Sequence, residues 1–168
     1  MKSRFSAGFV AVLTLALAPS LVGCAGGRPD PKWRELTVEA ASDNILWEVT
    51  VVALEKTGFP LGSGLDRGRL VAVSGWHTSL APFKGDGYRE RCYVEYTPLE
   101  NRKYHARVRV ERERNEDIVR PLDLSYAQWE PDPDDDRRAG MVLGYIQTML
   151  GTDFKVGERV KPGDLTTP

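Results

Sequence analysis

Two neighbouring runs of alternating residues constrain the fold of this 168-residue chain more than any other feature. One side of the first run consists of Tyr88, Glu90, Cys92, Val94 and Tyr96. One side of the second run consists of Tyr104, Ala106, Val108 and Val110. A period of two is typical of strands with one buried face. The segment 97–103 contains Pro98 and Asn101 and can form a turn, so the two runs predict an antiparallel hairpin.

The same pattern predicts the register of the hairpin. A turn centred on Glu100 places Tyr96 opposite Tyr104 and Cys92 opposite Val108. This register keeps every apolar side chain on one face, whereas a slip of one residue would turn one strand over. We therefore expect one buried face and one polar face.

The segment 43–57 has the spacing and the ends of a helix. Its apolar residues recur at intervals of three and four. Ser42 or Asp43 can cap the start, and Gly58 can take the left-handed conformation that ends many helices. Because apolar positions cover most of its circumference, we expect this helix to be buried on a broad face.

A second helix is predicted over 133–150. Asp132 can cap it, Pro133 suits its first position, and Gly151 can close it. Apolar residues repeat at four-residue spacing from Met141 onwards. This pattern gives the helix one apolar face.

The remaining segments complete the predicted order of elements. Residues 69–76 are expected to form a strand, 77–87 an irregular connection, and 115–129 an extended crossing segment around Pro121. The order is then helix, three strands, crossing segment and helix. It predicts an α+β fold, in which a small antiparallel sheet of about three to four strands is covered on one face by both helices.

The first residues have the layout of a secretory signal peptide. Lys2 and Arg4 precede an apolar run over 7–18, which is too short to span a bilayer. The tetrad Leu21-Val22-Gly23-Cys24 follows, and it resembles the bacterial lipobox. The resemblance implies cleavage before Cys24 and acylation of that cysteine, which would anchor the protein to a membrane. The alternative is an ordinary cleaved signal with a chance cysteine.

This leader divides the chain into four parts. They are a signal peptide over 1–23, a Gly- and Pro-rich tether over 24–32, a single α+β domain over 33–151, and a flexible C-terminal tail over 152–168. Ala25 rather than Asp follows the cysteine. With the lipobox, this residue implies a location in the bacterial envelope, anchored in the outer membrane and facing the periplasm.

Charge and cysteine content exclude further classes of protein. The chain has 23 Lys and Arg against 24 Asp and Glu, and loss of Lys2 and Arg4 with the signal would leave it slightly more acidic. A charge this small argues against nucleic acid as a partner. The chain has two cysteines, and lipid on Cys24 would leave Cys92 without an internal disulfide partner.

The order of elements, together with the lipobox, resembles the helix-and-sheet modules of BamC-type envelope lipoproteins. The resemblance covers only these two features, and it carries over no functional residue besides Cys24. It is consistent with our leading hypothesis, a non-enzymatic lipoprotein that scaffolds other envelope components or assists their assembly. Such a protein would have the membrane and an envelope protein as partners.

The polar face of the predicted hairpin is a candidate anion-binding surface. Its residues are Arg91, Tyr93, Arg107 and Arg109. In the expected register, Arg91 faces Arg109 and Tyr93 can stack on Arg107. These side chains could bind a lipid headgroup, a glycan acid or an acidic strip of a partner. The alternative is a solvated sheet face balanced by glutamates.

Catalytic and metal sites receive less support from the sequence. Cys92 lies on the apolar side of the hairpin, whereas His105 lies on its polar side. A nucleophilic thiol at Cys92 would therefore need His77 and an acidic side chain beside it. The acidic segment 130–136 could supply oxygen ligands for calcium but lacks the glycine and glutamate of an EF-hand loop. A helix start explains its charge equally well. We therefore predict no catalytic residue, metal or cofactor.

A second function remains open beside the scaffold. A lipid or an anionic glycan could bind between the helices and the sheet, where Met141 and Met149 would suit an adaptable pocket. A pocket of about 300 Å³ or more would favour this hypothesis. Because charged residues along the strands protect sheet edges, we expect the domain to be monomeric.

Overall fold

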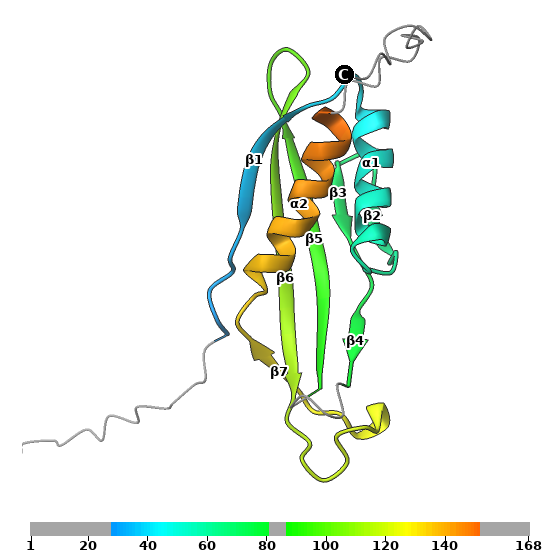
Figure 1. Cartoon of the computed structure of the whole chain (residues 1–168), viewed down its shortest axis with the longest axis vertical. Coiled ribbons are helices and arrows are strands. Elements are labelled where there is room, and N and C mark those ends of the chain that lie inside the picture. The colour runs from blue at the N-terminus through cyan, green and yellow to red at the C-terminus, as the bar shows by residue number, and fades with distance from the viewer. Residues whose placement is uncertain (1–27, 81–86, 152–168) are drawn as a thin grey trace, which may run out of the picture.

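The computed structural model describes residues 28–80 and 87–151, which form one antiparallel sheet with two helices on one face (Figure 1). The predicted signal peptide, the lipobox with Cys24 and the tail 152–168 lie outside the described residues. The strands are β1 (Arg34–Glu39), β2 (Gly64–Asp66), β3 (Val71–Val73), β4 (His77–Ser79), β5 (Tyr88–Pro98), β6 (Lys103–Asn115) and β7 (Trp129–Asp132). The helices are α1 (Asp43–Lys56) and α2 (Asp136–Gly151), and a single 3-10 turn, η1 (Leu124–Tyr126), precedes β7.

The central hairpin of β5 and β6 confirms the predicted faces but not the predicted register. Tyr96 pairs with Ala106 rather than with Tyr104, and Cys92 pairs with Val110. The cause is the turn, in which Asn101 and Arg102 both take the left-handed conformation, each with φ 59°. The turn is centred on Asn101, so the register moves by two residues. An even shift leaves each side chain on its face but changes its cross-strand neighbours.

The prediction of three to four strands is wrong, because the sheet has seven. Its order is β1-β6-β5-β3-β2, while β4 also pairs with β5 and β7 also pairs with β6. The long hairpin is therefore flanked on each side by two short strands. Strands β2, β3 and β4 have three residues each, which is too short for an alternating pattern to stand out in the sequence.

The short strands β2, β3 and β4 differ from the predicted elements. β3 is shorter than the predicted strand over 69–76, and Leu70 before it takes a positive φ of 53°. The predicted irregular connection over 77–87 begins with β4. β2 lies in a stretch of glycines, where Gly64 pairs with Val73.

A strand that the sequence pattern did not predict, β1, precedes the first helix. It lies along β6, with Arg34 opposite Val108 and Glu39 opposite Lys103. Its inward residues Leu36 and Val38 extend the apolar face of the sheet. β1 forms one edge of the sheet because it pairs only with β6.

The two helices confirm the predicted segments, with one corrected boundary. Ser42 caps α1 by accepting the amide of Ile45 at 3.3 Å, and Gly58 follows with φ 82°. The second helix begins at Asp136 rather than at 133, because Asp132 belongs to β7 and pairs with Arg112. Asp135 takes over the cap and accepts the amide of Arg138 at 2.9 Å.

The core lies between the helices and the inner face of the sheet. Its fully buried side chains include Leu46, Leu54, Val94, Val108, Val142 and Ile146. Met141, expected on the apolar side of the second helix, is 48% exposed, because α2 buries Ala139, Val142, Leu143 and Ile146 instead. In the part of the chain that the structure describes, no helix is long and apolar enough to cross a membrane.

Candidate functional site

The sheet face opposite the helices, called here the outer face, carries aromatic rings stacked on guanidinium groups. The Arg89 guanidinium lies 4.3 Å from the centre of the Trp76 ring and 4.8 Å from that of Trp129. Arg91 also lies over Trp76, at 4.5 Å, and a separate stack joins Arg107 to Trp33 at 4.4 Å. These distances are typical of cation–π contacts. The aromatic residues of the outer face are Trp33, Trp76, Tyr93 and Trp129.

The four residues predicted for the anion site all lie on the outer face, but their pairing is different. Arg91 faces Glu111 rather than Arg109, and its Nε lies 2.5 Å from a Glu111 oxygen. Tyr93 lies between Arg91 and Arg109, whose guanidinium carbons are 5.1 and 5.6 Å from its ring centre. Tyr93 does not stack on Arg107, which packs on Trp33 instead. The register shift of two residues explains these changes.

Each of these guanidinium groups has a carboxylate partner within the protein. Arg89 bonds Glu113 at 2.6 Å, and Arg107 lies 3.2 Å from Glu35. Arg109 bonds Asp134 through two nitrogens, at 2.6 and 3.1 Å. An incoming anion would have to displace these internal carboxylates. The geometry therefore favours the balanced sheet face over the anion-binding site.

The acidic segment that was considered for calcium is engaged in ion pairs and a cap. Asp132 lies 3.1 Å from Arg112, and Asp136 accepts from Arg34 Nε at 2.6 Å. Asp134 also accepts the backbone amide of Lys32 at 2.7 Å. Among the residues that the structure describes, no group of three or more His, Cys, Asp or Glu side chains is placed to hold a metal ion.

The structure gives Cys92 the surroundings of a core residue. Its side chain is fully buried, and burial raises the pKa of the thiol. The thiol donates weakly to the carbonyl of Tyr93 at 3.9 Å. His77 packs edge-on against Phe59, and His105 lies on the opposite face of the sheet beside Glu35. These contacts favour a protonated, unreactive thiol.

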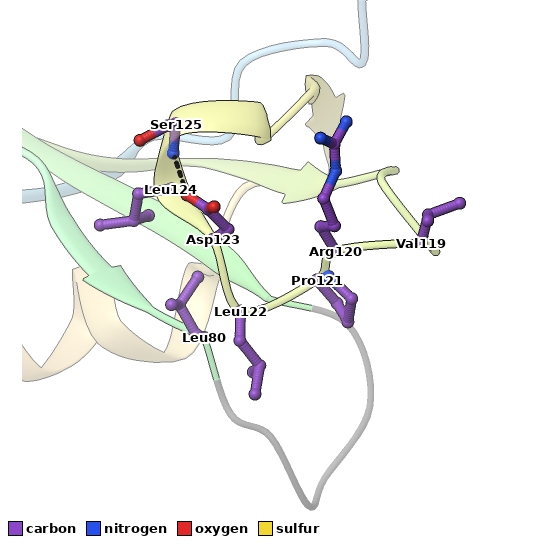
Figure 2. Close-up of a pocket in the computed structure, with 8 residues that line it drawn as sticks. All are labelled: Leu80, Val119, Arg120, Pro121, Leu122, Asp123, Leu124 and Ser125. Carbon is purple, nitrogen blue, oxygen red and sulfur yellow. Dashed lines mark hydrogen bonds between the residues drawn. The ribbon is translucent and has the colours of Figure 1, made fainter.

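A second surface feature, not found from the sequence, is the segment 116–128 between β6 and β7, called here the apolar loop. The exposed fractions of its residues Ile118 and Val119 are 85% and 80%, and those of Leu122 and Leu124 are 55% each. With Leu80, residues of this loop line an open hollow of about 680 Å³ (Figure 2). These apolar residues have no helical or strand periodicity in the sequence, so their exposure could not be predicted from it.

The apolar loop is held in place by polar residues at its base. Asp117 accepts the amides of Val119 and Arg120 at 2.9 Å each. Asn115 accepts the amides of Asp117 and Gln128 at 3.0 Å each. These bonds close the loop on itself, as Asp and Asn side chains commonly do in turns.

Comparison with known proteins adds no family to this description. No family model matches the chain, and no curated protein matches its sequence. The function must therefore be inferred from the residues themselves.

Proposed function

We propose that this protein is a non-enzymatic lipoprotein of the bacterial cell envelope that scaffolds another envelope protein or assists its assembly. The lipobox at 21–24 supports anchoring through lipid on Cys24, in the outer membrane and facing the periplasm. The observation that carries the docking role is the outer face, with its four aromatic rings and ordered arginines.

The composition of the outer face suits a protein partner. Trp, Tyr and Arg contribute most to the energetic centres of protein interfaces. Here Trp76 is in contact with two arginines, Arg89 and Arg91, and Arg91 is paired in turn with Glu111. Side chains that are already ordered lose little conformational entropy on binding. A surface of ordered aromatic and arginine side chains is better suited to another protein than to a small ion.

Site-specific photocrosslinking in cells tests this proposal. A photoreactive residue is introduced into the full-length chain at Glu95 on the outer face, or at Glu48 on the exposed side of α1 as the matched control. We expect one discrete protein adduct from position 95 and none of that size from position 48. Equal adducts from both positions, or none from position 95, would contradict docking through the outer face.

Two substitutions sharpen the test. Trp76→Ala removes the ring shared by Arg89 and Arg91 and should abolish the adduct. Tyr145→Ala removes an aromatic residue that is 44% exposed on α2 and should leave the adduct unchanged. Equal urea midpoints for the two variants would show that neither effect comes from unfolding.

Anchoring through Cys24 has its own test. The Cys24→Ala chain, exported but without lipid, should move from the membrane fraction to the soluble fraction of the envelope. Retention of this variant in the membrane at the wild-type level would contradict the lipid anchor.

A second candidate function, binding of a small apolar or anionic ligand, is favoured by the hollow of about 680 Å³. It lies at the apolar loop and not between the helices and the sheet, where the sequence analysis expected it. Mass spectrometry of protein purified without detergent exchange should reveal a bound lipid or glycan if this is the function. A ligand-free protein that still gives the outer-face adduct would leave the scaffold as the function.

A further inference from the structure

The exposed apolar side chains of the apolar loop form a group, whereas those elsewhere are scattered. Ile118, Val119, Leu122 and Leu124 are all at least 55% exposed within seven consecutive residues. The other large exposed side chains, among them Ile45, Leu61, Leu99 and Met141, belong to different parts of the fold. A concentrated apolar patch indicates contact with a partner or a membrane.

The charged side chains of the apolar loop are bonded to groups within the protein. Arg120 stacks on Tyr126 at 3.2 Å and lies 4.0 Å from Asp117. Asp123 accepts the amide of Ser125 at 2.9 Å (Figure 2). What the loop offers to its surroundings is therefore mainly apolar surface, beside one arginine, one tyrosine and the acidic residues Glu116, Asp117 and Asp123.

The number of residues between Cys24 and the described chain limits how far the apolar loop can lie from the proposed lipid anchor. Arg28, near the beginning of the described chain, pairs with Glu111 of β6, and Lys32 is held by Asp134. Arg28 is the fourth residue after Cys24, which limits their Cα distance to about 14 Å. Along β6, Glu111 lies four residues from Asn115, where the strand ends and the loop begins, a span of about 14 Å. A membrane that holds Cys24 is therefore within reach of the loop.

The overall shape agrees with this placement. In Figure 1 the blue segment that leads into β1 begins in the half of the molecule that carries the yellow apolar loop. The β5–β6 turn lies at the opposite end. In an orientation with the apolar loop towards the membrane, the β5–β6 turn therefore points away from the membrane.

We infer that the apolar loop inserts Ile118, Val119 and Leu122 into the interfacial layer of the membrane that holds the lipid on Cys24. This inference rests on the lipid anchor proposed above. Burial of apolar side chains at the acyl boundary drives the contact, while Arg120 and Tyr126 stay at headgroup level. The lipid retains the protein, and the loop sets the orientation of its domain.

Depth-dependent fluorescence quenching tests the inference on the full-length lipoprotein in vesicles of phosphatidylethanolamine and phosphatidylglycerol. A dye is attached at Leu122→Cys or, as matched control, at Leu99→Cys in the β5–β6 turn. Leu122 and Leu99 have similar exposure, 55% and 49%, and the buried Cys92 is protected from labelling. We expect spin-labelled lipids to quench the dye at 122 at least threefold more than the dye at 99. Equal and weak quenching at both positions would overturn the inference.

Two further measurements separate this inference from the proposals on which it depends. If Cys24→Ala is released from membranes but the dye at 122 in the lipidated protein is not quenched, the anchor stands and the loop contact fails. If Cys24→Ala stays in the membrane and the dye at 122 is quenched, the loop contact stands and the anchor fails. A dye at 122 that responds only when other envelope proteins are present would identify a protein contact and overturn the membrane contact.

Discussion

Arg138 of α2 donates to the carboxylate of Glu90, a residue of β5 that is only 1% exposed. The same guanidinium donates to the carbonyl of Thr57 at the end of α1, at 2.7 Å, and stacks 4.2 Å above Phe59. Arg112 lies 3.9 Å from the second oxygen of Glu90. One arginine thus joins both helices to the central strand.

Replacement of Glu90 should therefore destabilise the fold strongly. Glu90→Gln removes the charge and leaves Arg138 without its partner in a largely buried position, a change that costs about 3–5 kcal/mol. Urea denaturation should show a lower midpoint with an unchanged slope. The control is Glu39→Gln, because Glu39 pairs with Lys103 at 3.3 Å while 71% exposed. We expect this variant to lose less than about 1 kcal/mol, and equal losses in the two variants would contradict a special role for Glu90.

Two glycines should respond to alanine in opposite directions. A Cβ at Gly62 would lie 2.6 Å from the backbone nitrogen of Gly75, so Gly62→Ala forces two backbone segments apart. In α2, a Cβ at Gly144 meets nothing within 4 Å, and Gly144→Ala should stabilise the helix by about 0.5–1 kcal/mol. Thermal unfolding should give a lower Tm for the first variant and a higher Tm for the second. A gain in Tm from Gly62→Ala would disprove the close approach.

The thiol of Cys92 should be almost inert in the native protein. Burial raises its pKa, so the thiolate is scarce and the sulfur is shielded. Reaction with a disulfide reagent requires opening of the core, which reduces the rate by about three orders of magnitude relative to the unfolded chain. The measurement compares the modification rate at pH 8 with and without guanidinium chloride. Similar rates in the two conditions would place the thiol at the surface instead.

The apolar loop should lose part of its support in acid. The amides of Arg120 and Val119 donate to Asp117 and hold the pKa of its carboxyl below the ordinary value of 3.8. The carboxylate therefore contributes its full stabilisation above pH 3.8, and this is lost as the pH falls through the lower pKa of the folded state. Carboxyl carbon chemical shifts in an NMR titration should give a midpoint below that of the unfolded chain. A midpoint at or above the unfolded value would show that the two amide bonds are not maintained in solution.

The parts of the fold that could be predicted from the sequence are those determined by local residues. The faces of β5 and β6 follow from alternation over long strands, and the ends of α1 follow from Ser42 and Gly58. These features depend on neighbours in the chain, which the sequence displays directly.

The parts that could not be predicted depend on distant partners or on a choice between similar turns. Pairing of β1 with β6 joins Arg34 to Val108, and nothing in the sequence near Arg34 marks this partner. The turn at Asn101 and Arg102 gives a strand register two residues away from that of a turn centred on Glu100. Both registers keep the apolar side chains on one face of the hairpin. This small difference decided which residues of the outer face meet, so the arginine pairs of the candidate site could not be assigned correctly.

The pairing of β1 with β6 also sets the order in which the domain can be completed. Arg34 can pair only after Val108 has been synthesised, and the amide of Lys32 can bond only after Asp134 has been synthesised. During synthesis, which starts at the N-terminus, β1 therefore stays unpaired until most of the domain has been made. Closing so long a loop makes folding slow, since the entropy of the intervening chain is lost before these contacts form. During that interval, residues 32–39 remain accessible to solvent and to other proteins.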